Sequence, residues 1–213
     1  MHLHGTVVGG EPGFDAVTLT TWALYNFVAL AVVPFLYFHR RRGYSLAALN
    51  LRSPDRQSDA LLILGVLSVE SLVQILGLMS ESIVGLSLGE ALRAGGVAFV
   101  ANLLGTGLPV MIFAFAIMLP RYARLTGSFA ATMVLGALTY AGLHLLESWT
   151  VYDSLASGML SVAFVLFMFV GPGLIKAYLT LRTGNAWVHL WAYHAVAPHV
   201  VADAPLVEEA LRR

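Results

Sequence analysis

Histidine and glutamate share one face of a predicted membrane helix. His144 and Glu147 are three residues apart, so an α-helix places both side chains on one face, about a turn from each other. Tyr140 lies one turn before His144 and extends this polar stripe. Ionisable groups inside a membrane are costly, and they indicate function by default. The stripe is therefore a candidate site for acid–base or metal chemistry.

A second set of ionisable residues follows toward the C-terminus. It consists of His189, His194, His199 and Asp203. His199 and Asp203 are four residues apart, which again places them on one helical face. Pro198 removes a backbone hydrogen bond and can bend the helix, which would let His194 and His199 converge.

Imidazole and carboxylate groups together are the usual ligands of zinc and non-haem iron, and helical bundles build such sites from facing helices. We therefore expect a site for a divalent metal, zinc or iron, that activates water. The predicted ligands are His144, Glu147, His194 and His199. The alternative is that these histidines are interfacial hydrogen-bonding residues, because Trp149, Trp187 and Trp191 mark an aromatic belt.

The elements that carry these residues are apolar segments. Of 213 residues, 58% are hydrophobic and 11% are charged, against about a quarter charged in a soluble domain. A membrane-spanning helix needs about 20 apolar residues. Six segments approach this length: 17–38, 60–79, 95–119, 127–147, 155–180 and 186–203. The sequence predicts an all-α fold, a polytopic membrane bundle of about six transmembrane helices forming a single domain over residues 1–213.

The charges of the chain set its predicted topology and limit its partners. Twelve basic residues balance twelve acidic ones, which gives no indication of a nucleic-acid partner. The segment after the first span holds the arginines at 40–42, and the positive-inside rule places this loop in the cytoplasm and the N-terminus outside. Arg121, Lys176 and Arg182 fall on the same side by alternation. The arginines are also compatible with contact to anionic lipid.

Other residues limit the chemistry or leave it open. The absence of cysteine excludes disulfides, thiolate metal sites and a cysteine nucleophile. Glu70 and Gln74, one turn apart on the second span, and Asn102 on the third either form hydrogen bonds between helices or line a cavity with the histidines. Glycine and proline at 105–109 and 171–173 interrupt two spans, either to expose backbone groups or to permit close helix packing.

Three stretches of the chain carry a family resemblance. The first is the basic loop at 40–42 followed by Leu49-Asn50-Leu51-Arg52, in which Asn50 stands where glycine is usual. The second runs from Leu119-Pro120-Arg121 to Tyr140-Ala141-Gly142-Leu143-His144. The third is Thr183-Gly184-Asn185-Ala186-Trp187 followed by His194. On these residues, most of the chain resembles the CPBP family, the membrane proteins grouped with CAAX proteases and bacteriocin-processing enzymes.

The resemblance implies an intramembrane endopeptidase of the CAAX type, in which a glutamate oriented by histidines activates water. His144 and His194 fall on the histidines of the family. The family's glutamate pair and the arginine after it correspond here to Val110, Met111 and Phe115. Because these side chains cannot accept a proton, the expected general base is missing. Pro198 likewise replaces the asparagine of the third motif.

Two functions are compatible with these residues. In the first, the chain is a CPBP-like membrane metallohydrolase or peptidase, in which His144 and His194 bind a metal or orient water and Glu147 is a ligand or base. In the second, it is a catalytically inactive pseudo-protease that binds a membrane peptide, a lipid or a partner in the bilayer. The missing glutamate pair favours the second function, and the two retained histidines favour the first.

Overall fold

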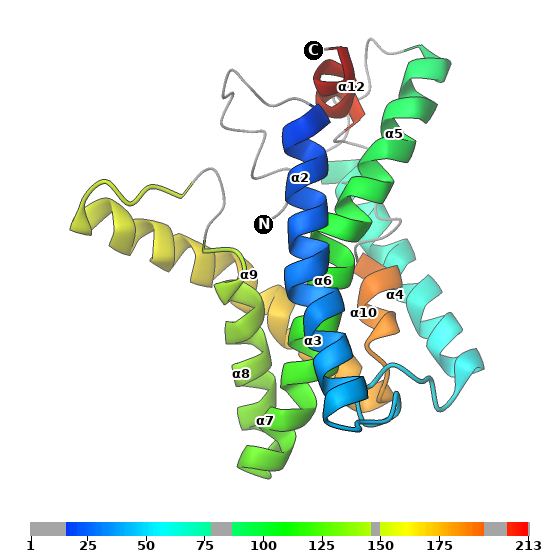
Figure 1. Cartoon of the computed structure of the whole chain (residues 1–213), viewed down its shortest axis with the longest axis vertical. Helices are drawn as coiled ribbons and strands as arrows, with labels where there is room; N and C mark the ends of the chain where they lie inside the picture. The colour runs from blue at the N-terminus through cyan, green and yellow to red at the C-terminus, as the bar shows by residue number, and fades with distance from the viewer. Residues whose placement is uncertain (1–15, 78–86, 146–149, 194–203, 213) are drawn as a thin grey trace.

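The computed structural model describes residues 16–77, 87–145, 150–193 and 204–212. In these ranges the regular elements are all helices, which confirms the predicted all-α fold (Figure 1). Three of the described helices are long and apolar enough to cross a membrane: Ala16–Arg41, Leu88–Thr126 and Leu155–Thr183. They match the first, third and fifth predicted spans, and they support a membrane protein.

Two of these long helices contain wider, π-helical turns. The first consists of α2 (Ala16–Asn26), η1 (Phe27–Val32), α3 (Val33–Leu36) and η2 (Tyr37–Arg41). The second consists of α5 (Leu88–Asn102), η3 (Leu103–Gly107), α6 (Leu108–Val110), η4 (Met111–Met118) and α7 (Leu119–Thr126). The turns η1, η3 and η4 end just before Pro34, Pro109 and Pro120. Proline lacks an N–H and crowds the preceding turn, and a wider turn lets the helix continue.

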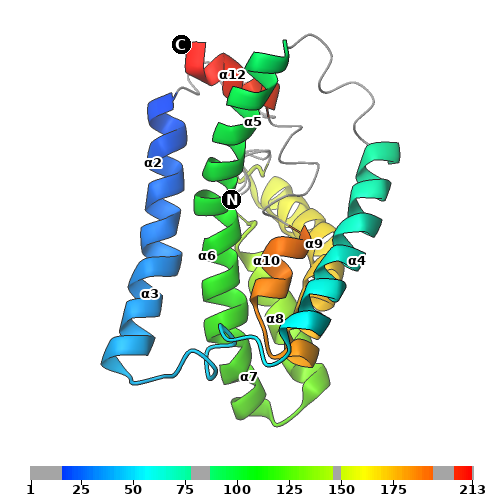
Figure 2. The same cartoon turned by 90° about the vertical axis from the view of Figure 1, so that its right-hand side faces the viewer.

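The third long helix is α9 (Leu155–Thr183), which has no π-helical turn. The other described helices are α4 (Arg56–Gly77), α8 (Phe129–Gly142), α10 (Trp187–Tyr193) and α12 (Ala204–Arg212). The fourth predicted span, 127–147, is helical only to Gly142 before a turn begins. The sixth, 186–203, is described only as far as Tyr193. Figure 2 shows α5–α7 between α2–α3 on one side and α4 with α10 on the other.

The loop before α4 is joined to the connection between α9 and α10. Buried Asp59 accepts hydrogen bonds from the Ser53 hydroxyl at 2.6 Å and from the Asn185 side-chain amide at 2.7 Å. The Ala186 N–H donates to the carbonyl of Asn50 at 2.7 Å, and the Trp187 indole N–H donates to the carbonyl of Leu51 at 3.0 Å. These bonds position α4 and α10 next to each other.

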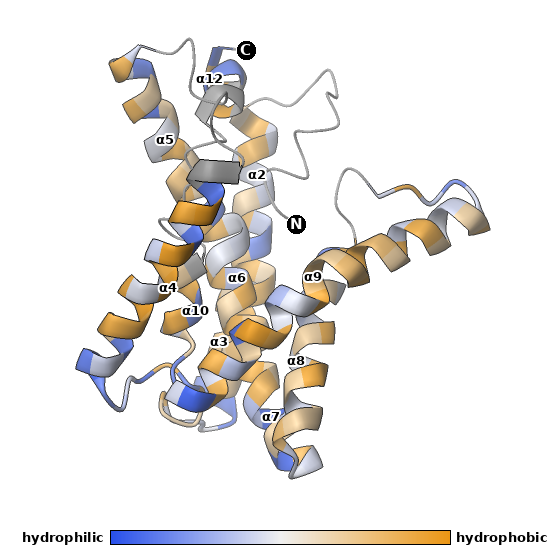
Figure 3. Cartoon of the chain, turned by 180° about the vertical axis from the view of Figure 1, so that it is seen from behind, coloured by the Kyte–Doolittle hydropathy of each residue, from blue (hydrophilic) through white to orange (hydrophobic). Residues whose placement is uncertain are grey.

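Helices α8 and α9 cross at small residues, with α9 running diagonally behind the bundle (Figure 3). A Cβ added at Gly173 of α9 would lie 2.9 Å from the Cα of Ala137 in α8. A Cβ at Gly136 would lie 3.2 Å from the Cβ of Ala177. Small residues let helix backbones approach closely in membranes. The glycine at 173 therefore serves close helix packing, one of the two alternatives open from the sequence.

We expect that Gly173→Ala lowers the free energy of unfolding by about 1–3 kcal/mol, because the added methyl group meets the backbone of α8. Gly171→Ala is the control, since a Cβ at Gly171 has no atom within 4 Å. Reversible unfolding of the detergent-solubilised protein measures both values. Equal effects of the two substitutions would contradict the close crossing.

Candidate functional site

Polar side chains from four elements are buried near the α8–α9 crossing. Helix α9 contributes Lys176, which is 4% exposed, and α8 contributes Tyr140, which is 2% exposed. His144, in the turn after α8, and His189 of α10 are completely buried. Glu70 of α4 is partly buried. We call these five residues the central polar cluster.

Lys176 links the cluster through one hydrogen bond and one longer charge interaction. Its Nζ donates to the Tyr140 hydroxyl at 2.8 Å and lies 4.3 Å from the centre of the Tyr140 ring. Lys176 and Glu70 attract each other electrostatically. Glu70 Oε1 also accepts a hydrogen bond from the Gln74 amide at 2.9 Å. Since burying an unpaired charge is expensive, this opposite charge and the phenol oxygen allow an ammonium group at this position.

Aromatic rings fix the two histidines of the central polar cluster. The His144 ring stacks on Phe169 of α9 with 3.9 Å between the ring centres and 6° between the planes. Tyr140 meets His144 edge-on with centres 4.8 Å apart, as expected for residues one turn apart. The His189 ring lies 4.5 Å from Phe115 and 6.4 Å from Tyr140. Both imidazoles are therefore packed against aromatic rings.

Phe115, which the sequence resemblance sets at the arginine position of the CPBP family, lies beside this cluster. Val110, Met111 and Phe115 are 3%, 0% and 0% exposed, and they belong to the main hydrophobic core. Phe115 of η4 contacts both His189 and Tyr140. The space around the histidines is thus occupied on this side by apolar carbon, which offers neither a proton acceptor nor a metal ligand.

Only part of the predicted metal site can be placed. His144 is buried at the end of α8, in agreement with an inward orientation. Glu147, His194 and His199 lie outside the described residues, as does Asp203. Within the described ranges, no group of three or more histidine, aspartate or glutamate side chains could hold a metal ion. Metal binding by these four residues therefore stays a prediction.

Other polar residues of the predicted spans form hydrogen bonds within their own helices. The hydrogen bond between Glu70 and Gln74 lies within one helix, and the charge of Glu70 reaches the central polar cluster. Asn102 also bonds within its own helix, to the carbonyl of Ala98 at 3.1 Å. Neither of these two bonds joins helices, and the lining of a cavity by Glu70 stays a prediction.

Lys176, which alternation assigns to the cytoplasmic end of the fifth span, is buried inside α9. The side of the membrane on which this end lies stays a prediction. Lys176 lies within the predicted segment 155–180, and an ionisable residue inside a span is a functional candidate by default. This position in the sequence could have identified it as a site residue. Thr180, one turn further and fully buried, has no such signal in the sequence.

We expect energetic coupling between Lys176 and Glu70 of about 0.5–3 kcal/mol, measured from the unfolding free energies of Lys176→Met, Glu70→Gln and the double variant. Removing either charge leaves the other poorly compensated, so the double variant is more stable than the sum of the single effects predicts. Pairing Lys176→Met with Ser68→Ala, an exposed position of α4, should be additive. Additivity in both pairs would contradict the interaction.

The chain was also compared with known proteins. No family model, no curated protein and no solved structure matches it. The resemblance to CPBP proteins therefore depends on the residues quoted from the sequence alone.

Proposed function

We propose that the protein is a catalytically inactive, CPBP-type membrane protein that binds a peptide segment within the bilayer instead of cleaving it. The observation that carries this proposal is the burial of Val110, Met111 and Phe115 in the apolar core beside His189 and Tyr140. General-base hydrolysis needs a proton acceptor next to the attacked bond, and the family's position for it holds hydrocarbon.

Local geometry supports the resemblance at two of the quoted stretches. Asn50, which stands where the family has glycine, has a φ of 52°, a left-handed conformation that suits glycine and that asparagine tolerates. The stretches at 49–52 and 183–187 also contact each other through the bonds of Asn50 and Leu51 to Ala186 and Trp187. The Asn50 side-chain amide donates to the backbone carbonyl of Phe115 at 3.4 Å. Phe115 stands where the family has its arginine, so this bond links that position to the contact between stretches 49–52 and 183–187.

In this proposal the topology is that predicted from the sequence: about six spans, cytoplasmic basic loops and an external N-terminus. The three long apolar helices support spans one, three and five. The basic residues of the loops support this orientation. Lys176 is not counted among them, because it is buried in α9.

The surface proposed for the peptide is the first half of α9, which projects beyond the other helices (Figures 1 and 3). A hollow of about 660 Å³ lies along it. Its lining residues are Tyr152, Ser154, Leu155, Gly158, Met159, Val162, Ala163 and Leu166. The lining is mostly apolar, and Gly158 and Ala163 permit close approach of another helix. A membrane-spanning peptide helix fits these properties.

We expect no hydrolysis of prenylated or membrane-spanning peptides above background by the protein in nanodiscs, with or without added zinc. Mass spectrometry of the peptides measures cleavage, and His144→Ala serves as the control for any residual activity. Turnover that disappears in His144→Ala would overturn the non-hydrolytic proposal.

Binding is tested with a photo-crosslinking side chain introduced at Val162 and a synthetic membrane-spanning peptide. Val162 lines the hollow, whereas Phe167 lies on the same helix and is 82% exposed outside it. We expect crosslinking from position 162 and not from 167, and Gly158→Leu should abolish it by filling the hollow. Equal crosslinking from both positions would mean that the peptide merely diffuses in the bilayer.

The second candidate is a membrane metallohydrolase that uses His144, Glu147, His194 and His199. The observation in its favour is the complete burial of His144 and its fixed stacking on Phe169, because preorganised imidazoles suit metal coordination. In this function the metal would bind water and lower its pKa to about 7, which would replace the lost glutamate base.

Elemental mass spectrometry of detergent-purified protein tests the metal site. If it exists, the wild type holds one equivalent of zinc or iron, and both His144→Ala and His199→Ala lose it. His39→Ala is the matched control, because His39 bonds to the carbonyl of Tyr44 at the basic end of the bundle. No bound metal and no uptake of added zinc or iron would contradict this candidate.

A further inference from the structure

Arginines from two distant parts of the chain meet at one end of the bundle. Arg41 ends the first long helix and Arg42 follows it, while Arg121 and Arg124 belong to α7 at the end of the second. The guanidinium of Arg121 lies 3.6 Å from the centre of the Phe38 ring. The Tyr44 ring is 4.8 Å from the Arg121 guanidinium and 5.0 Å from that of Arg124. We call these four arginines and Tyr44 the basic pocket.

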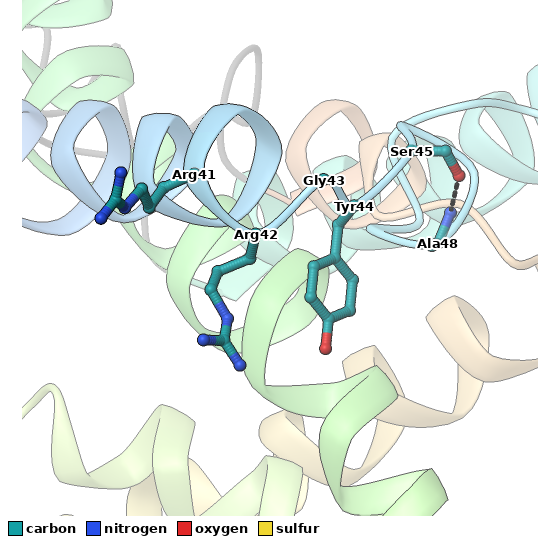
Figure 4. A pocket seen from close by; sticks show the side chains of 6 residues that line it. All are labelled: Arg41, Arg42, Gly43, Tyr44, Ser45 and Ala48. Carbon is teal, nitrogen blue, oxygen red and sulfur yellow. Dashed lines mark hydrogen bonds between the residues drawn. The ribbon is translucent and has the colours of Figure 1, made fainter.

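An open hollow of about 660 Å³ lies beside these residues, and Arg41, Arg42 and Tyr44 of the basic pocket line it, whereas Arg121 and Arg124 do not (Figure 4). Its lining residues are Arg41, Arg42, Gly43, Tyr44, Ser45 and Ala48. The side chains of Arg42 and Tyr44 extend in the same direction in Figure 4. The Ser45 hydroxyl accepts a hydrogen bond from the Ala48 N–H at 3.1 Å, so its own proton can be donated. The hollow therefore presents guanidinium and hydroxyl donors together.

The positive charge of the basic pocket is not balanced by acidic side chains. Among the described residues, none of the four arginines forms an ion pair with aspartate or glutamate. Arg42 and Arg124 are close enough to repel Arg121 electrostatically. Like charges held together destabilise the fold unless a counter-charge joins them, so the arrangement favours a bound anion.

The central arginine is held in place and retains donor capacity. Arg121 donates through Nη1 to the carbonyl of Ile117, one turn earlier. Its Nη2 is buried and has no hydrogen-bond acceptor in the described parts of the chain. A planar guanidinium fixed by stacking on an aromatic ring is suited to bind phosphate through two parallel hydrogen bonds. An anion with several oxygen atoms would accept hydrogen bonds from the Arg121 guanidinium and from neighbouring donors at the same time.

The position of the basic pocket relative to the bilayer favours a lipid headgroup as the bound anion. The basic pocket lies where two candidate membrane spans, Ala16–Arg41 and Leu88–Thr126, end on the same side of the bundle (Figure 2). Just before it, Val33, Leu36 and Tyr37 expose apolar surface. A lipid bound here can place its phosphate among the arginines and its acyl chains along this apolar face. Basic clusters at this depth are attracted to anionic lipids.

We infer that the basic pocket binds the phosphate group of one anionic phospholipid through Arg121, Arg42 and Tyr44. The site is separate from the central polar cluster, and its occupancy does not depend on whether the protein hydrolyses or binds peptides. A lipid held between α7 and the first long helix would join the two helices at their ends.

Native mass spectrometry of the detergent-purified protein tests this site with phosphatidylglycerol and with phosphatidylcholine. Both lipids carry a phosphate, but only the first has a net negative charge. We expect one phosphatidylglycerol bound at least about tenfold more tightly than phosphatidylcholine, since a charge-assisted pair of hydrogen bonds contributes about this factor. Equal affinity for the two lipids would overturn the inference.

Substitutions locate the site. Arg42→Gln removes an exposed side chain and should leave the fold intact, yet weaken phosphatidylglycerol binding about tenfold. Arg121→Lys keeps the charge but loses the planar fork, and it should weaken binding as well. Arg40→Gln and Arg182→Gln remove equal charge outside the pocket and should change affinity less than about twofold. Equal losses in all four variants would indicate unspecific charge attraction and contradict the site.

A competition experiment separates a lipid phosphate from a soluble one. Glycerol 3-phosphate has a related headgroup but no acyl chains, and we expect that millimolar concentrations do not displace phosphatidylglycerol. Displacement by glycerol 3-phosphate, lost in Arg42→Gln, would assign the basic pocket to a soluble phosphate compound and overturn the lipid assignment.

Discussion

The close approach of α8 and α9 positions the central polar cluster. Gly173 rests against Ala137, and Ala177 lies beside Gly136, so the two backbones meet with hardly any side-chain volume between them. This contact brings Lys176 of α9 within hydrogen-bond distance of the Tyr140 hydroxyl of α8. In a low-dielectric interior such a bond is strong and its loss is costly, so the crossing and the polar pair depend on each other.

Apolar packing around the histidines is the main argument about function. In a hydrolase the region beside these rings must hold a proton acceptor and water, whereas here Phe115 packs against His189 and Tyr140. Val110, Met111 and Phe115, which the sequence resemblance sets against a glutamate pair and an arginine, fill this part of the core with hydrocarbon. Apolar packing at these positions supports the proposed binding function.

The two charged regions of the protein are organised differently. In the central polar cluster the Lys176 amine donates a hydrogen bond to a phenol oxygen and interacts with the Glu70 carboxyl group over a longer distance, since a buried polar group cannot rely on solvent. In the basic pocket four arginines stand together near the end of two spans, where water and lipid headgroups can compensate them. The first arrangement stabilises the bundle internally, and the second directs it toward an anionic surface.

The sequence by itself determined the all-helical membrane class, because the length and apolarity of segments are local properties set by bilayer thickness. It also placed Tyr140 and His144 on one stripe and paired Glu70 with Gln74, since residues one turn apart meet in any helix. It did not place Lys176 beside Tyr140, His189 beside Phe115 or Arg121 over Phe38. Those contacts join helices far apart in the chain, and only the packing of small against large side chains at each crossing decides them.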